Sequence, residues 1–562
     1  MKRVCMKTAM LLVAWCCTMG AWAYDFEANG IYYGITSTAD KTIEVVAGDT
    51  QYSGDVTIPA TVTYNGTTYR VTSIAWSAFK DCSRLTSIVL PESLTLIGNF
   101  AFSGCSRLTS ITLPESLTSI ESYAFTGCSN LASIVIPDGV TSIEGGTFYN
   151  CSSLSSIILP ESLTSIGETA FTFCSSLVSI ALPESLIFIG RDAFRGCSSL
   201  ASIVIPDGVT SIEGSTFYNY SSLASIVIPE RVTSIGGYAF SGCSNLVSIT
   251  LPEGITSIGD YTFWGCSSLA SIVIPDGVTS IEGSTFYNCS SLASIALPES
   301  LISIGNEAFR GCRSLASIVI PKMVTSIGGY AFSGCSNLVS ITLPEGITSI
   351  GSRTFYNCSS LASITLPESL TSIGSEAFWE CSSLTSIVIP DGVTFIENFT
   401  FYNCSSLASI TIPENVTTIG LAAFSGCSNL QEIHSLAITP STCGSDCFGG
   451  VDKNACTLYV PKGSLEAYKK AYTWKDFKNI VEEEYTGIEE VGADSAGQAV
   501  ITSCGDGIVV ENLPAGTAVT VYTLSGTVVY KGVARGSRTE LTLPAGHLYL
   551  VKCGPTVTKV AL

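Results

Sequence analysis

A phenylalanine recurs every 23 residues from Phe79 to Phe424, sixteen times without a gap. A cysteine follows each of them three residues later, except at Tyr220, and a proline marks a third register from Pro91 to Pro413. The unit reads C-S-x-L-x-S-I-x-[IL]-P-x-x-[LVI]-T-x-I-x-x-x-[AT]-F-x-x. A fixed period of this length is typical of chains built from stacked repeats.

Each unit is expected to contain one short strand. The segment L-x-S-I-x-[IL], as at residues 85–90 and 131–136, alternates as a half-buried strand does. The proline that follows ends the strand because it has no N–H for the ladder. The chain then turns over a second apolar patch, Leu94 and Ile97 in the first unit, before it reaches the phenylalanine. One unit cannot bury its own apolar face, so successive coils are expected to stack with strands ~4.8 Å apart.

Composition and charge narrow the class of protein. The chain has 562 residues, of which 46% are hydrophobic and 13% charged, so it is too apolar for a disordered chain. Its net charge of -20 argues against a nucleic-acid partner, because phosphate binding needs a basic surface. Residues 1–23 are interpreted as a signal peptide, and no later run reaches the ~18 apolar residues of a transmembrane helix.

The other segments are assigned around the repeat. The hairpin turn expected at residues 64–67 belongs to an N-terminal cap, and Ser464 is the expected N-cap of a short helix ending near Tyr472. Turns at 524–527 and 544–546 indicate a small β-sandwich near the C-terminus. The expected segments are the signal peptide (1–23), N-terminal cap (24–75), solenoid of about 15–16 repeats (76–435), C-terminal cap (436–483), acidic linker (484–498) and β-sandwich (499–562).

The repeat resembles the BspA-like leucine-rich-repeat proteins in its motif AF-x-x-C-x-x-L-x-S-I-x-[IL]-P, over roughly residues 54 to 482. The resemblance implies a β-rich solenoid with one long parallel sheet and two caps. It also implies a surface or secreted bacterial protein that adheres to host matrix proteins or to other bacteria. Better-known leucine-rich repeats carry an asparagine where this chain has Ser93, Gly139 or Asn415, so the hydrogen-bonding role of that position stays open.

The C-terminal segments VYTLSGTVVY, LPAGHLYLVK and TKVAL resemble the sorting domain of the type IX secretion system. That resemblance implies passage across the outer membrane of a Gram-negative bacterium, followed by anchoring or release there. A plain β-sandwich module is the alternative.

No residue pattern indicates catalysis, and no cofactor or metal is expected. The two histidines, His434 and His547, have no evident partner in the sequence. None of the common hydrolase, zinc-protease or P-loop motifs occurs, and a serine nucleophile needs an activating base. We therefore expect the protein not to be an enzyme.

The cysteine column is expected to be a row of buried free thiols that act as small hydrophobes. The 23-residue spacing is not that of zinc ligands. Two pairs outside the column are candidate disulfides: Cys443 with Cys456 in the C-terminal cap, and Cys504 with Cys553 in the tail.

Three surfaces are candidates for partner binding. One is the outward face of the strands, where every unit places a serine, as at Ser87, Ser110, Ser133, Ser202 and Ser271. The second is the acidic ladder, the residue after each proline, which is acidic in all units but one, where Lys322 stands. The third consists of the aromatic residues directly after the column phenylalanine: Tyr149, Tyr218, Trp264, Tyr287, Tyr356, Trp379 and Tyr402.

Each surface also has a structural interpretation: a solvated β face, a solubilising edge and packing between coils. The acidic ladder is also a candidate for weak binding of divalent cations, because neighbouring carboxylates ~5 Å apart repel by roughly 0.8 kcal/mol in water. The leading hypothesis is a secreted or cell-surface adhesin that binds protein ligands. The alternative is a structural spacer or display scaffold without a specific soluble ligand.

Overall fold

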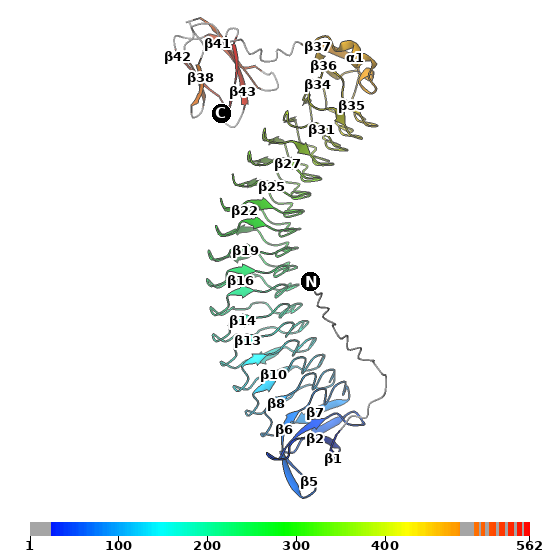
Figure 1. Cartoon of the computed structure of the whole chain (residues 1–562), viewed down its shortest axis with the longest axis vertical. Coiled ribbons are helices and arrows are strands. Elements are labelled where there is room, and N and C mark those ends of the chain that lie inside the picture. Colours follow the sequence, from blue (N-terminus) through cyan, green and yellow to red (C-terminus); the bar gives the residue numbers. More distant parts are fainter. Residues whose placement is uncertain are drawn as a thin grey trace, which may run out of the picture. The chain divides into compact units, whose positions relative to one another are not determined.

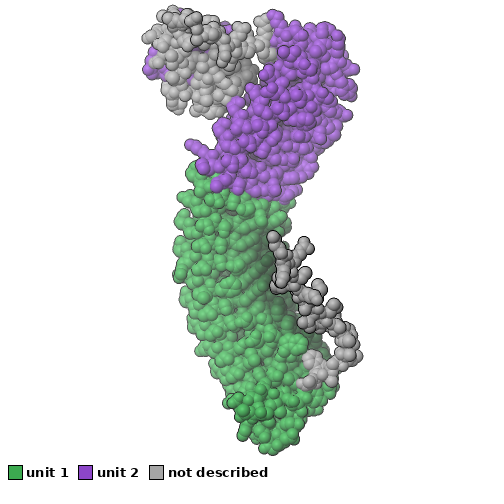
Figure 2. Space-filling model, in the orientation of Figure 1, with its two compact units in different colours: residues 1–301 green, residues 302–562 purple. Residues whose placement is uncertain are grey.

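The computed structural model describes residues 24–483, 500–504, 507–511, 516–523, 528–533, 538–543, 548–553 and 556–561. Its contacts divide the chain into two compact units, Met1–Leu301 and Ile302–Leu562, which Figure 2 colours separately. The expected signal peptide, the linker, the turns at 524–527 and 544–546, and His547 all lie outside the described residues.

The first unit begins with a small sheet that precedes the repeats. Its strands before the repeats are β1 (Phe26–Ala28), β2 (Ile31–Ser37), β3 (Thr42–Val46), β5 (Thr61–Tyr64) and β6 (Thr67–Ile74), whereas β4 (Gly54–Thr57) pairs separately with a strand of the first coil, residues 85–89. Strands β5 and β6 pair as a hairpin whose turn residues, Asn65 and Gly66, have φ of 47° and 78°. Both angles are positive, as a two-residue hairpin turn requires, so the turn predicted at this place is confirmed.

The repeats of the first unit form successive coils with two parallel series of short strands (Figure 1). The series predicted from L-x-S-I-x-[IL] comprises β7 (Leu85–Val89), β10 (Ser133–Val135), β12 (Ser156–Ile158), β16 (Ser225–Val227), β18 (Ser248–Thr250), β20 (Ser271–Val273) and β22 (Ser294–Ala296). The other comprises β8 (Leu96–Ile97), β9 (Ser119–Ile120), β11 (Ser142–Ile143), β13 (Ser165–Ile166), β14 (Phe188–Ile189), β15 (Ser211–Ile212), β17 (Ser234–Ile235), β19 (Ser257–Ile258) and β21 (Ser280–Ile281). Pairing of Ser133 with Ser156 and of Ser142 with Ser165 sets each coil one repeat from the next.

The second unit repeats this arrangement. Its first series comprises β24 (Ser317–Val319), β26 (Ser340–Thr342), β28 (Ser363–Thr365), β30 (Ser386–Val388), β32 (Ser409–Ile412), β34 (Glu432–Ser435), β36 (Thr457–Pro461) and β37 (Asn479–Glu483). Its second series comprises β23 (Ser303–Ile304), β25 (Ser326–Ile327), β27 (Ser349–Ile350), β29 (Ser372–Ile373), β31 (Phe395–Ile396), β33 (Thr418–Ile419) and β35 (Thr442–Cys443). The predicted class, a β-rich solenoid with parallel pairing, is confirmed, and the pairing is distributed over two series of short ladders.

Phenylalanine fills the interior of every coil. All sixteen column phenylalanines are fully buried. Neighbouring rings within a unit stack nearly parallel: the ring centroids of Phe102 and Phe125 lie 5.3 Å apart with an interplanar angle of 6°, and those of Phe378 and Phe401 lie 5.4 Å apart with an angle of 3°. The column is therefore core, as the sequence predicts.

The cysteine column is buried and carries free thiols, as expected, and it also makes hydrogen bonds. From Cys105 in the first unit and Cys335 in the second, thiols donate to the carbonyl of the phenylalanine 26 residues earlier, at 3.1 to 3.3 Å. Burial raises the pKa of these thiols, to about 12 at Cys335. The cysteine is thus a link between successive coils and not only a small apolar side chain.

The position that holds asparagine in better-known repeats also links coils. The single O–H of Ser185, and likewise that of Ser369, is shared between two carbonyls of the preceding coil, and Asn415 donates to the carbonyl of Asp391 at 3.0 Å. The role left open by the sequence is therefore filled where serine or asparagine occurs, whereas Gly139 offers no side-chain donor.

The last coil is covered by α1 (Leu465–Lys470) and the 3-10 turn η1 (Trp474–Asp476). Ser464 precedes the helix as predicted, but it makes no side-chain cap because its hydroxyl donates to the carbonyl of Pro461 at 2.5 Å. The Glu482 carboxylate accepts instead from the backbone N–H groups of Gly463 and Leu465. Among the residues described, no helix has both the length and the apolar character needed to cross a membrane.

The C-terminal strands form two antiparallel sheets. One contains β38 (Val500–Cys504), β39 (Gly507–Glu511) and β42 (Arg538–Thr542), and the other contains β40 (Ala518–Thr523), β41 (Val528–Val533), β43 (Leu548–Cys553) and β44 (Thr556–Ala561). Ile508 and Leu541 of the first sheet share a buried cluster with Val519 and Val551 of the second. Two sheets that share one core make a β-sandwich, as predicted.

Candidate partner-binding site

His434 has partners that the sequence did not reveal. Its imidazole stacks on Tyr459 at 4.5 Å, its Nδ1 lies 3.3 Å from a carboxylate oxygen of Glu483, and its Nε2 lies 3.7 Å from Glu432. The expectation that it has no partner is therefore wrong, because parallel pairing of β34, β36 and β37 brings these residues side by side. These contacts with one ring and two carboxylates join His434 to the neighbouring strands at the end of the sheet.

The serine face is exposed in the predicted way. Ser87, Ser110, Ser133, Ser202 and Ser271 are all solvent-exposed. Beside them stand aliphatic side chains with large exposed fractions, 78% at Val204 and 82% at Val319. Ser87 is already engaged, because its hydroxyl donates to Asp55 of the adjacent strand β4 at 2.6 Å.

The predicted aromatic residues lie in the tight turns around the column phenylalanine. Trp264 is 37% exposed, and Tyr149, Tyr218, Tyr287, Tyr356, Trp379 and Tyr402 are half-buried. Several contact the equivalent residue of the next coil: Trp264 stacks on Tyr287 at 5.9 Å, and Trp379 stacks on Tyr402 at 4.1 Å. They are therefore both packed between coils and accessible.

A second aromatic column was missed by the sequence analysis. It comprises the residues two places before the column phenylalanine: Phe100, Tyr123, Tyr238, Tyr261, Tyr330 and Phe399. Contacts of 6.3 Å between Tyr218 and Tyr238, and 5.3 Å between Trp379 and Phe399, join the two columns within each unit. We call the two columns together the aromatic edge. Their fixed offset from the repeating phenylalanine was the signal that would have revealed the second one.

The backbone of this second column is left-handed. Tyr238, Tyr261 and Tyr330 have φ of 61°, 58° and 59°. The turn demands this conformation in every coil, since Ser215 and Ser284 adopt it as well. A bulky side chain there costs roughly 1–2 kcal/mol compared with glycine. Stacking between coils offsets that cost: the ring centroids of Tyr238 and Tyr261 lie 4.6 Å apart, and the interplanar angle is 4°.

The stacking decides which ring surfaces a partner meets. Tyr238 is 39% exposed, yet one of its faces is covered by Tyr261, so its accessible atoms lie largely along the ring edge and hydroxyl. Arginines cover further faces: Arg195 lies 4.7 Å from the Tyr218 ring, and Arg353 lies 5.3 Å from Tyr330 while it pairs with Glu376. A sugar ring needs a free aromatic face, whereas exposed edges, hydroxyls and guanidinium groups suit a protein surface.

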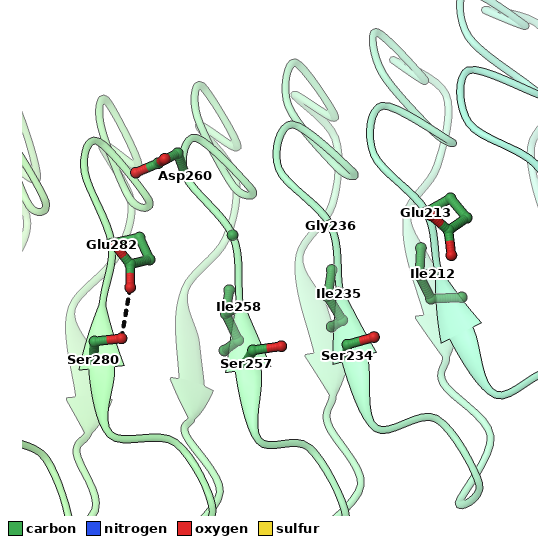
Figure 3. A pocket seen from close by; sticks show the side chains of 11 residues that line it. Ile212, Glu213, Ser234, Ile235, Gly236, Ser257, Ile258, Asp260, Ser280 and Glu282 are labelled. Atoms are coloured by element: carbon green, nitrogen blue, oxygen red, sulfur yellow. Dashed lines mark hydrogen bonds between the residues drawn. The ribbon is translucent and has the colours of Figure 1, made fainter. Parts of the chain in front are cut away.

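A shallow groove of about 420 Å³ crosses four coils of the first unit (Figure 3). Ser234, Ser257 and the adjacent isoleucines line its middle, and Gly236 and Gly259 leave it open between Glu213 and Glu282. Both glutamates accept a hydrogen bond from a serine of their own coil, Ser211 at 2.7 Å and Ser280 at 2.6 Å. With Asp260 the lining holds three carboxylates and no basic residue, so it favours hydrogen-bond donors or cations from a partner.

The acidic ladder is exposed along the coils, as at Glu92, Glu115 and Asp138. Within the part of the chain that the structure describes, no three His, Cys, Asp or Glu side chains are grouped to hold a metal ion. Among those residues the ladder therefore holds no ready-made group of three ligands.

The candidate disulfides are not formed in the structure. Cys443, Cys456 and Cys553 all carry free thiols, and the side chain of Cys504 lies outside the described residues. The Cys443 thiol donates to the Ser441 carbonyl at 3.8 Å, and its neighbour is Cys447, which the sequence analysis did not consider: burial and the nearby Cys443 raise the pKa of Cys447. Cys456 lies instead among Glu432 and Asp452, and Cys553 packs in the sandwich core.

Comparison with known proteins adds a family and a fold. A family model described as "BspA type Leucine rich repeat region" matches residues 72–201, 141–270, 210–339 and 325–455. No match was found among curated proteins. A solved leucine-rich repeat protein from Bacteroides ovatus is 31% identical with a TM-score of 0.51, and the match covers 82% of this chain and all of that one.

Two further solved structures are similar at lower scores. A leucine rich cell surface protein from Faecalibacterium prausnitzii is 26% identical with a TM-score of 0.38, and the match covers 60% of this chain and 93% of that one. The leucine-rich repeat protein of T. pallidum is 29% identical with a TM-score of 0.28, and the match covers 43% of this chain and 90% of that one.

Proposed function

The chain belongs to the BspA-type leucine-rich repeat family, and from this premise we propose that it is a protein-binding module whose partner docks along the aromatic edge. The observation that carries the proposal is the concentration of tyrosine, tryptophan and arginine on that edge, joined by contacts such as Trp379–Tyr402 and Arg195–Tyr218. These three residue types dominate the energetics of protein interfaces. The edge is also pre-organised, because stacking between coils fixes the side chains before a partner arrives.

The proposal extends to location. We propose that residues 1–23 direct export and that the C-terminal β-sandwich is a sorting domain of the type IX kind, so that the mature chain acts outside the cell. Fractionation of the native cells, with antibody against the mature chain, tests this directly. Recovery in the cytoplasm at full length contradicts it.

The partner proposed is a host matrix protein or another bacterial surface, and binding is tested with immobilised fibronectin and fibrinogen. The edge variant combines Tyr238→Ala and Trp379→Ala, whereas the matched control combines Val204→Arg and Val319→Arg on the serine face. Surface plasmon resonance is expected to give saturable binding that weakens at least ~10-fold in the edge variant, because interface anchors of this type contribute 2 kcal/mol or more. The control is expected to bind like the unaltered chain.

A second candidate function rests on the serine face. Within each unit this face exposes uncharged valines, Val204 and Val227 in the first and Val319 in the second, and exposed apolar side chains of this kind can mark an interaction surface. This observation favours the structural alternative, a spacer or display scaffold that self-associates. Binding of neither matrix protein, together with self-association that Val319→Arg abolishes, supports this candidate over the first.

A further inference from the structure

The coil that closes the solenoid places two cysteines at positions that are apolar in the preceding coil. Cys443 ends β35 and pairs with Ile419 of β33. The carbonyl of Cys447 accepts from Phe424 N–H at 2.8 Å, as the carbonyl of Ala423 accepts from Phe401 N–H one coil earlier. The repeat register therefore substitutes cysteine for isoleucine and for alanine within one turn, at two positions whose counterparts in the preceding coil, Ile419 and Ala423, are both fully buried. The Cys443 thiol donates to the Ser441 carbonyl at 3.8 Å, and burial together with the neighbouring Cys443 raises the pKa of Cys447.

The column thiols make shorter hydrogen bonds to the backbone than Cys443 does. Cys404 and Cys427 donate to the carbonyls of Phe378 and Phe401, both at 3.2 Å, so each is satisfied by backbone. They are also buried, which withholds them from any oxidant in solution. Cys443 is partly exposed, whereas Cys447 is buried behind it.

We propose that Cys443 and Cys447 form a disulfide when the chain meets a disulfide donor, and that this bond closes the turn on which the C-terminal cap rests. The Cys443 thiolate attacks one sulfur of the donor disulfide, which gives a mixed disulfide and releases one donor thiol. The Cys447 thiolate then attacks the Cys443 sulfur, which releases the second donor thiol. Two protein thiols are oxidised, one donor disulfide is reduced to two thiols, and both protons leave with them.

The exposed fractions set the order of these steps. Cys443 is the thiol that a donor reaches, and Cys447 is the resolving thiol because burial raises its pKa and shields it. The turn also carries the cap. Trp474 Nε1–H donates to the Ser441 carbonyl at 2.8 Å, and the Ser441 hydroxyl donates to the Val416 carbonyl at 2.6 Å. A bond between residues 443 and 447 therefore fixes the seat of Trp474, which covers the end of the core.

The test uses the purified mature chain incubated with oxidised glutathione. Free thiols are alkylated before and after unfolding with two distinguishable reagents, and the peptide that contains residues 443–447 is weighed without reduction. The expected peptide has lost two hydrogen atoms and carries neither label, while the column cysteines carry only the label applied after unfolding. Alkylation at both Cys443 and Cys447, or a Cys443–Cys456 cross-link, overturns the proposal.

Two variants make the assignment specific. Cys447→Ser removes the resolving thiol, so Cys443 is expected to keep a stable glutathione adduct. Cys456→Ser is the matched control and is expected to form the bridge as fully as the unaltered chain does. Absence of the adduct in the first variant, or loss of the bridge in the second, contradicts the pairing. The result is independent of the proposed binding function, since no partner takes part in the assay.

Discussion

Removing the hydroxyl of the buried Tyr220 is expected to stabilise the protein, whereas most substitutions in a core destabilise it. Tyr220 replaces a cysteine in the cysteine column, it is fully buried, and its hydroxyl has no hydrogen-bond partner among the described residues. The rings on either side are spread, since Phe194 and Phe217 lie 6.0 Å apart while other neighbouring column rings within a unit lie 5.1 to 5.7 Å apart. Leaving a hydroxyl buried and unpaired costs about 1–3 kcal/mol. Tyr220→Phe removes that hydroxyl and keeps the ring, so it is expected to stabilise the coil by about 1–2 kcal/mol.

Tyr468 is the matched control for this substitution. It is equally buried, but its hydroxyl is bonded to the Ser435 hydroxyl and to the Ala437 carbonyl, both at 2.7 Å. Tyr468→Phe leaves those two groups short of a partner and is expected to destabilise the protein by about 1–3 kcal/mol. The same chemical change therefore has opposite signs at the two sites.

Urea denaturation gives the global free energy of unfolding, and amide hydrogen exchange reports the coils around each site. The local readout is needed because repeat arrays can unfold in parts. Slower exchange in residues 194–243 of Tyr220→Phe is the expected result. Faster exchange there, or no change, refutes the reasoning, because it means that the hydroxyl is satisfied in solution.

Three further predictions concern the links between coils and the buried thiols. Cys266→Ala is expected to lower the free energy of unfolding by about 2 kcal/mol, because it removes one hydrogen bond and one buried heavy atom, and Cys266→Ser is expected to lower it less because serine keeps a donor. Equal urea midpoints for the unaltered chain and both variants would count against the thiol hydrogen bond. Ser369→Ala is expected to lower the free energy of unfolding by about 1 kcal/mol, because it removes the hydroxyl that is bonded to the carbonyls of Glu345 and Ile347. Ser363→Ala, on the exposed face of the same coil, is expected to change it by less than about 0.5 kcal/mol, and similar shifts of the urea midpoint at both sites would contradict the link between coils. Burial raises the pKa of Cys335 to about 12, whereas an unfolded thiol titrates near 9. Its contribution to the free energy of unfolding is therefore complete below about pH 9 and falls by about 1.4 kcal/mol per pH unit up to about pH 12, and a urea midpoint that stays constant from pH 8 to pH 10 contradicts this burial.

The repeating coil and the residues in its interior could be predicted from the sequence. Because the period was invariant, the phenylalanine of every unit had to occupy the same place, and alternation within L-x-S-I-x-[IL] settled which side of the strand was exposed. The direction in which Ser202 and Ser271 point follows from that alternation alone.

Contacts between coils were beyond the sequence. The bond from Cys105 to the Phe79 carbonyl depends on the direction of a backbone carbonyl, which residue types do not encode. The placement of Cys443 and Cys447 at neighbouring core positions required the register of the last coil, because Phe448 lies 24 residues after Phe424 and so falls outside the strict period. The partners of His434 likewise arise from strands that are distant in the chain.

Successive coils stack so that each column cysteine meets the backbone of the neighbouring coil and not another thiol. A crystal structure phased on the anomalous scattering of sulfur locates the sulfur atoms directly. The expected map shows single sulfur sites along the column in each unit, spaced at roughly the ~4.8 Å of adjacent strands. Sulfurs found in pairs ~2.05 Å apart, bridging one coil to the next, would contradict the stacking as described.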